Sequence, residues 1–254
     1  MISEERKAIL VQELNINGYV HVAEMAKKLQ ITAATIRRDL SMLESQGICN
    51  RKRGGAVRTA QGVSFEPAYD VKRIRYEDQK RLIAEVAQKL VVDGNAIILD
   101  AGSTTYALAL QLLQRKNLKV VTNDLKIAVS LASNPNIHTI VTGGTARRYV
   151  FSLQGPQSEI FIKNLLVDQT FLGADAIHAD GSIYNVNLDE VPIKQAMIAA
   201  ASQVILVADS SKFEKTGFAK VCDMSQIDLV ITDRNLPAEK LELIRSLNVP
   251  VVCV

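Results

Sequence analysis

Apolar side chains recur at helical spacing along the first part of the chain, so this part is expected to be mainly helical. Asn17-Gly18 interrupts the first periodic stretch, and Gly47 ends the third. Thr32 stands directly before that third stretch and is suited to cap a helix. The expected elements are a helix over residues 3–16, a second over 21–29, a third that begins after Thr32 and runs to about Gln46, and a hairpin over 48–58 with a basic tip.

A different pattern begins at Gly94, where short and almost purely apolar segments alternate with amphipathic helices. Such segments are typical of parallel strands covered on both faces. Residues 59–75 are polar and mixed and are interpreted as a linker, and residues 76–92 as a helix that opens a second domain. The sequence therefore predicts an α/β class, with a mainly parallel sheet within 76–254. The expected strands are Ala96–Leu99, Lys119–Thr122, Thr139–Thr142, Gln169–Leu172, Val204–Ala208, Leu229–Thr232 and Val249–Val254.

Composition narrows the kind of site that the chain can carry. The three cysteines and three histidines are scattered, which argues against a disulfide frame and against a metal site, and no motif calls for a cofactor. No apolar run approaches the roughly 18 residues of a membrane span, and the N-terminus lacks the apolar core of a signal peptide. We therefore expect a cytoplasmic chain with no membrane partner.

Charge is distributed unevenly along the chain. The net charge is only +3, but residues 1–60 carry ten Lys or Arg against six Asp or Glu. The basic excess therefore lies in the N-terminal segment, as the binding of a polyanion requires.

The third expected helix has two different sides. Ile36, Leu40 and Leu43 fall on one side and are expected to pack on the first two helices. The opposite side is small near its start and cationic in the middle, so it suits the major groove of DNA, and the basic hairpin tip suits phosphates. The alternative is a plain helical bundle with a solvated charged face. The residues expected to contact DNA are Thr32, Ala34, Thr35, Arg37, Arg38, Ser41, Arg51, Lys52 and Arg53.

The segment from Ile31 to Ala56 closely resembles the helix-turn-helix signature of the DeoR family of bacterial regulators. The matching residues are Thr35–Leu40 on the recognition helix and Arg51, Gly54, Gly55 and Ala56 in the wing, while Thr32 stands where the family more often has serine. Later blocks of the chain also look like the effector domain of that family. The resemblance implies a winged helix-turn-helix over 1–58, a linker over 59–75 and an effector-sensing domain over 76–254.

Polar residues follow four of the expected strands, where a parallel α/β sheet holds its ligands. The first group opens a helix and is expected to cradle a phosphate with its amides and hydroxyls, although such a group is also a common helix cap. Each of the other groups also has a purely structural interpretation. The residues expected to hold a small anionic effector, such as a phosphorylated sugar, are Asp100, Gly102, Ser103, Thr104, Thr105, Gly143, Gly144, Arg147, Gly173, Asp175, Glu190, Lys194, Asp209 and Lys212.

The second domain also resembles ribose-5-phosphate isomerases. Their phosphate loop is echoed at Asp100–Thr105, but two of the three carboxylates of a later block are missing at 172–176. The resemblance places Lys194 where those enzymes carry their catalytic glutamate, and Glu190 is the only obvious substitute. Because isomerisation needs a carboxylate base, the pattern implies a sensor rather than an enzyme.

Three functions are therefore weighed. The first is a transcription regulator, expected to be a repressor of a carbohydrate-metabolism operon that a phosphorylated sugar modulates. The second is a sugar-phosphate isomerase with an appended DNA-binding arm. The third is a nucleoid-type DNA binder whose second domain only dimerises. Helix-turn-helix proteins bind paired half-sites, so we expect a homo-oligomer, either a dimer or a tetramer.

Overall fold

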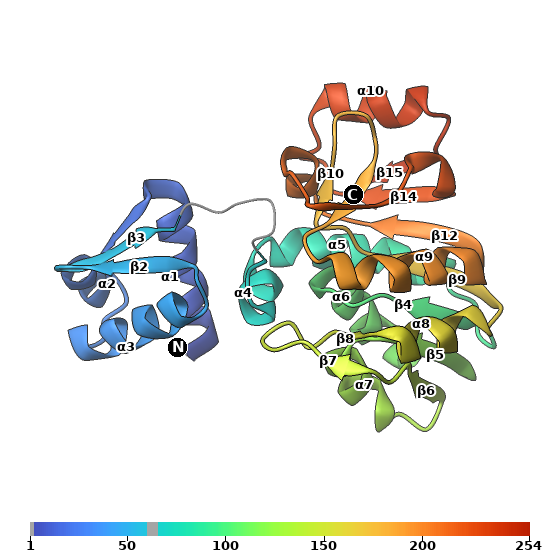
Figure 1. The fold of residues 1–254 in the computed structure, drawn as a ribbon, viewed down its shortest axis with the longest axis horizontal. Helices are drawn as coiled ribbons and strands as arrows, with labels where there is room; N and C mark the ends of the chain where they lie inside the picture. Colours follow the sequence, from blue (N-terminus) through green and yellow to red (C-terminus); the bar gives the residue numbers. More distant parts are fainter. Residues whose placement is uncertain (1–2, 60–65) are drawn as a thin grey trace. The chain divides into compact units, whose positions relative to one another are not determined.

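A computed structural model describes residues 3–59 and 66–254 of the chain, which divide into two compact units, Met1–Arg75 and Tyr76–Val254 (Figure 1). We call them unit 1 and unit 2. Residues 60–65 of the expected linker lie outside the described residues. Each unit has its own apolar core, so each is described by itself.

Unit 1 contains the three predicted helices and the predicted hairpin. Thr32 caps the third helix, because its hydroxyl accepts a hydrogen bond from the Thr35 amide at 3.2 Å. Leu10, Ile36 and Leu40 are fully buried in the core that these helices share. The elements are α1 Ser3–Asn17, α2 Val22–Lys28, α3 Ala33–Ser45, β2 Cys49–Lys52 and β3 Gly55–Arg58.

Two further elements of unit 1 were not predicted. Strand β1, Tyr19–His21, pairs antiparallel with β3, which lies in the middle of a three-stranded sheet. Helix α4, Tyr69–Ile74, occupies the end of the expected linker and contacts α1. The interpretation of 69–74 as linker was therefore wrong, because Val71 is buried in the apolar core of unit 1. Both elements are too short to show a clear apolar period.

Unit 2 is built on a seven-stranded sheet in which every neighbouring pair is parallel, in the order β15-β14-β12-β9-β4-β5-β6. All seven predicted strands are present, so the predicted α/β fold class is confirmed. The order reverses between β4 and β9, which start the two halves of the sheet. The strands are β4 Ala96–Leu99, β5 Leu118–Thr122, β6 Ile137–Val141, β9 Val167–Leu172, β12 Ala201–Val207, β14 Leu229–Thr232 and β15 Val251–Cys253.

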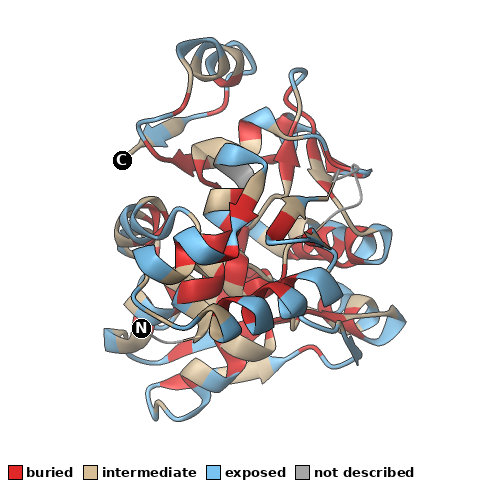
Figure 2. Ribbon diagram, turned by 90° about the vertical axis from the view of Figure 1, so that its left-hand side faces the viewer, coloured by how far each residue is buried: buried red, intermediate tan, exposed pale blue. Residues whose placement is uncertain are grey.

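Helices cover both faces of this sheet, and in Figure 2 many helices carry buried residues on one side and exposed residues on the other. Alternate residues of a strand point to opposite faces. Leu99 therefore packs with α5, α6 and α7 in one cluster, whereas Ile98 packs with α8 and α9 in another. The helices are α5 Glu77–Ala87, α6 Ser103–Gln111, α7 Leu125–Ala132, α8 Pro156–Lys163, α9 Val191–Ala200 and α10 Ala238–Ser246.

Two small antiparallel sheets lie outside the main sheet and were not predicted. One is a hairpin between β6 and α8, and the other has the order β10-β11-β13. Their strands have two to four residues, too few to show an alternation of apolar and polar positions. The strands are β7 Thr145–Ala146, β8 Leu153–Gln154, β10 Ala176–Ile177, β11 Ile183–Asn185 and β13 Ala219–Cys222.

Candidate functional site

The side of α3 that the sequence predicts to read DNA is exposed within unit 1. Arg37, Arg38 and Ser41 are all exposed, and so is Ala34 near the helix start. Thr35 is half-buried because its hydroxyl and that of Thr32 lie 2.9 Å apart at the cap. The helix thus presents small residues at its N-terminal end and two guanidinium groups in the middle.

The opposite side of α3 carries a buried ion pair. Asp39 is 1% exposed and accepts two hydrogen bonds from the Arg6 guanidinium of α1, at 2.9 and 3.3 Å. This pair fixes the rotation of α3 about its axis, so that Arg37 and Arg38 face outward. Of the residues in the DeoR-like motif, Asp39 therefore holds the helix in place.

The three basic residues of the wing differ in their surroundings. Lys52 and Arg53 are exposed at the hairpin tip, as expected of phosphate contacts. Arg51 is half-buried, and its guanidinium donates hydrogen bonds to α3, at the Arg37 carbonyl and the Ser41 hydroxyl. The sequence grouped the three residues because it could not show which way each side chain of the hairpin points.

In unit 2, three of the residues expected to bind an effector, Asp100, Gly173 and Lys194, meet where the strand order reverses. Asp100 follows β4 and Gly173 follows β9, and the Gly173 amide donates to the Asp100 carboxylate at 2.9 Å. The ammonium group of Lys194, from α9, forms an ion pair with Asp100 and donates to the Gly173 carbonyl at 3.1 Å. In parallel sheets this switch point is where ligands bind.

Lys194 is almost fully buried and charged. Its burial disfavours the ammonium form, but the carboxylates of Asp100 and Glu190 outweigh this effect and hold the pKa of Lys194 above its ordinary value. The second carboxylate oxygen of Asp100, Oδ1, is buried and has no hydrogen-bond partner within the described part of the chain. A hydroxyl donor brought to this place would satisfy that oxygen.

Helix α6 begins beside this pair. Ser103, Thr104 and Thr105 form its buried first turn, and the amides of such a turn have no acceptor within the helix. The Thr105 hydroxyl donates to the Gly102 carbonyl at 2.8 Å, so it closes the turn rather than pointing away from it.

Asp124 is a residue of this region that sequence analysis missed. Its carboxylate caps α7 by accepting from the Lys126 and Ile127 amides, and it also accepts from the Gly102 amide at 3.2 Å. Burial raises the pKa of Asp124 to about 6, even though these amides stabilise the charged form. The sequence held a signal for this residue, because Asp124 stands directly before an apolar periodic stretch. An Asp at such a position is a typical helix cap.

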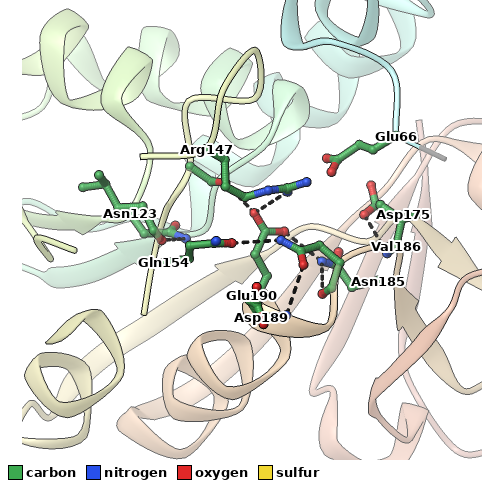
Figure 3. A network of polar contacts seen from close by, with 12 residues as sticks. Glu66, Asn123, Arg147, Gln154, Asp175, Asn185, Val186, Asp189 and Glu190 are labelled. Carbon is green, nitrogen blue, oxygen red and sulfur yellow. Dashed lines mark hydrogen bonds and ion pairs between the residues drawn. The ribbon is translucent and has the colours of Figure 1, made fainter. Parts of the chain in front are cut away.

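Glu190 is held by three donors. Arg147, from the loop of the β7–β8 hairpin, and Asn185, from β11, each donate to its carboxylate at 2.8 Å (Figure 3). The Ser152 hydroxyl is the third donor. Burial alone disfavours the charge, but Arg147, Lys194 and the hydrogen bonds outweigh it, so the pKa of Glu190 lies below its ordinary value. Ser152 and Asn185 were not predicted, because no motif marks them.

Three of the remaining predicted residues are charged. Asp175 accepts from the Val186 amide at 3.3 Å, and its charge acts on Lys194. Asp209 and Lys212 form a second cluster after β12, where the charge of Lys212 favours the ionised form of Asp209 and the pKa of that carboxyl is lowered despite its burial.

Gly143 and Gly144 follow the edge strand β6 and turn the chain toward α8. Their φ angles are +75° and +104°. A Cβ atom on Gly144 would lie 2.5 Å from the Gln154 carbonyl, whereas one on Gly143 would meet nothing within 4 Å. Gly144 is therefore required by close packing, and Gly143 by its backbone conformation alone.

Among residues 3–59 and 66–254, no cluster of three or more His, Cys, Asp or Glu side chains is suited to hold a metal ion. Within the same residues, no helix combines the length and the apolar character needed to cross a membrane.

Both units match domains of known proteins. Residues 6–61 match the DeoR-like helix-turn-helix domain, and residues 75–234 match the DeoR C-terminal sensor domain. A solved ribose 5-phosphate isomerase A from Methanocaldococcus jannaschii aligns with a TM-score of 0.40 and 19% identity, over 54% of each chain.

Several curated relatives match over nearly the whole length. A putative aga operon transcriptional repressor of Escherichia coli is 34% identical over 99% of this chain and 94% of its own. The HTH-type transcriptional regulator GlpR of Haloferax volcanii is 35% identical over 99% and 98%, and a glycerol-3-phosphate regulon repressor of Escherichia coli is 30% identical over 96% of both chains. The chain therefore belongs to the DeoR family and is a DNA-binding transcriptional regulator.

Proposed function

We propose that the chain represses carbohydrate-metabolism genes and that a phosphorylated sugar, or a similar small anion, changes its affinity for the operator. The relatives named as repressors of the aga operon and of the glycerol-3-phosphate regulon support the choice of target and effector class. The proposal places the chain in the cytoplasm, where operator DNA lies, and pairs it with further copies as a dimer or tetramer, because two half-sites need two reading heads.

The DNA-reading part of the proposal rests on α3. The exposed guanidinium groups of Arg37 and Arg38 can fork onto base edges or phosphates, and Ala34 and Thr35 allow the helix start to approach the groove closely. Lys52 and Arg53 at the wing tip bind neighbouring phosphates, which carry no sequence information.

The sensing part rests on one observation, the first turn of α6 beside the Asp100–Lys194 pair at the sheet switch point. The free amides of that turn attract an anion, while Asp100 Oδ1 and the nearby carboxylates accept hydrogen bonds from sugar hydroxyls. A phosphorylated polyol carries both kinds of group. Gly143, Gly144 and the Asp209–Lys212 cluster contribute neighbouring loops at the same edge of the sheet.

We further propose that unit 2 is not an isomerase. A general base has to be free to take a proton, with a pKa near the working pH. The carboxylate of Glu190 is instead held ionised by Arg147, Ser152 and Asn185, and its pKa lies below its ordinary value. The ammonium of Lys194 is protonated and has no proton-accepting site.

The test has two parts. Phosphorylated sugars are first screened for those that raise the melting temperature of the full-length chain, with the unphosphorylated sugars as controls. Ligands that pass are then added to the chain bound to DNA from upstream of its own gene. An effector that weakens DNA binding must itself bind the DNA-bound chain more weakly, by the same factor. If no sugar phosphate shifts the melting temperature, the sensing proposal fails. If the chain binds every duplex equally, selective repression fails.

The separate roles proposed for α3 and for the wing tip in DNA binding have their own test. Arg38→Ala is expected to weaken binding to the operator by about 1–3 kcal/mol while leaving nonspecific binding nearly unchanged. The double variant Lys52→Gln/Arg53→Gln is expected to weaken binding to all DNA alike and to flatten the salt dependence. Equal effects of the two changes on both duplexes would contradict this assignment.

A further inference from the structure

Arg51 lies on the wing, but its side chain is directed back to the recognition helix. Its Nη1 donates to the Arg37 carbonyl and to the Ser41 hydroxyl, both at 2.9 Å, and its Nε donates to the Gly55 carbonyl at 3.3 Å. One guanidinium group therefore joins β2, β3 and α3. The acceptors on α3 lie four residues apart and so belong to successive turns on one side of the helix.

A second contact reinforces this junction. The backbone amide of Arg51 donates to the Glu44 carboxylate at 2.6 Å, one turn further along α3. The strand β2 is thus attached to α3 at 37, 41 and 44. Two of these positions, 37 and 41, are among those that the sequence predicts to contact DNA.

We propose that Arg51 is a positioning residue for DNA reading, which holds the wing against α3 and orients the Ser41 hydroxyl and the turn that carries Arg37. The inference rests on DNA reading by α3 and concerns a role that the charge of the wing alone does not supply. Phosphate binding remains the role of Lys52 and Arg53, whose side chains are exposed at the hairpin tip.

The chemistry of the contact explains why an arginine stands at this position. A planar guanidinium presents several donors in fixed directions and can reach a main-chain carbonyl, a hydroxyl and a second carbonyl at once. A lysine carries the same charge on a single flexible ammonium and cannot reproduce the three directions. Arg51→Lys therefore separates positioning from charge, because it removes the first and keeps the second.

The experiment uses the full-length chain and two duplexes, one selected by binding from a random-sequence pool and one with the same bases scrambled. Affinity for each is measured over a series of salt concentrations for the unmodified chain and for Arg51→Lys, Arg51→Gln and the control Lys52→Gln. Loss of one phosphate contact lowers the slope of log affinity against log salt by about 0.9. Loss of a positioning contact leaves that slope unchanged.

We expect both Arg51 variants to bind the selected duplex roughly 10- to 100-fold more weakly, as the loss of a charge-assisted hydrogen bond implies, with little change on the scrambled duplex. Lys52→Gln is expected to lower the slope and to weaken both duplexes alike. Ser41→Ala is expected to combine with Arg51→Gln less than additively, because the two side chains share one contact.

Three outcomes overturn the inference. If Arg51→Lys matches the unmodified chain while Arg51→Gln lowers the slope as Lys52→Gln does, Arg51 is a phosphate contact. Equal losses on both duplexes, together with a lower melting temperature for unit 1, would make its role merely structural. If the unmodified chain does not distinguish the two duplexes, DNA reading itself fails and the inference fails with it.

Discussion

The buried pair between Arg6 and Asp39 permits a quantitative test of how α3 is held. Asp39→Asn keeps the size of the side chain but removes its charge. It also replaces one of the two oxygens that accept from Arg6 with a donor. The Arg6 side chain is only 11% exposed and would then lie against α3 without the charge of Asp39.

Two typical values bound the unfolding free energy that Asp39→Asn removes. Losing a hydrogen bond to a charged group costs about 1.5–3 kcal/mol, and removing one partner of a fully buried ion pair costs about 3–5 kcal/mol. Arg6 lies at the rim of the core and Asn still accepts one hydrogen bond, so the lower end of the second range applies. We expect unit 1 to lose about 3 kcal/mol of unfolding free energy.

Amide hydrogen exchange of the full-length chain measures this loss locally. Core amides of residues 33–45 exchange through opening of unit 1, so about 3 kcal/mol corresponds to roughly 100-fold faster exchange. The matched control is Glu13→Gln, because Glu13 accepts from Lys28 at 3.0 Å in the same unit, where the Lys28 side chain is 60% exposed. Pairs of this kind contribute about 0–1 kcal/mol.

The comparison of the two variants decides the argument. If Asp39→Asn accelerates exchange no more than Glu13→Gln does, burial does not distinguish the pairs and Asp39 does not hold α3. If exchange accelerates in unit 2 as strongly as in residues 33–45, the effect is not local and the loss of stability does not come from the Arg6–Asp39 contact.

Three further predictions concern unit 2 and are tested by its unfolding free energy. Folding raises the pKa of Asp124 from 3.8 to about 6, so folding favours the protonated carboxyl and stability is lost as pH rises through this range. Asp124→Asn should shrink the stability difference between pH 4 and pH 7 by about 2 kcal/mol, and an unchanged pH profile would refute this. Lys194→Met should cost about 3–5 kcal/mol by leaving Asp100 buried without its partner, and the double variant with Asp100→Asn should recover part of that loss; a loss as large in the double variant would show that the ion pair is not the cause. Gly143→Ala should cost about 1–2 kcal/mol through its positive φ, and Gly144→Ala should cost more because its Cβ also meets backbone; equal costs would remove the packing argument.

Long periodic patterns allowed most of the fold to be predicted. The seven strands of the main sheet are mostly apolar because both faces are covered, and this pattern can be recognised in a single sequence. Strand β1 and helix α4 were missed because three and six residues hold less than two periods of their structures. Such short elements form because neighbouring elements bury them, which is tertiary information.

The sequence indicated which strand ends form the candidate site, but it did not show most of the contacts within that site. Asp100, Gly173 and Lys194 were all chosen from the sequence, and the strand order brings them together. The direction of a side chain could not be predicted, which is why Arg51 was grouped with its neighbours in the wing. Asp124 was missed because its sequence neighbours mark it as a cap of α7, whereas its contact with the Gly102 amide depends on the fold.

The middle position of β3 in the small sheet has a consequence for how unit 1 is made. Its central strand is the last to leave the ribosome, since β1 at 19–21 and β2 at 49–52 both pair with residues 55–58. A chain cut before Gly55 therefore leaves two strands with no partner between them. We expect the helices of unit 1 to gain lasting order only after residue 58 has been synthesised, so fragments that contain α1–α3 alone should not fold into a reading head.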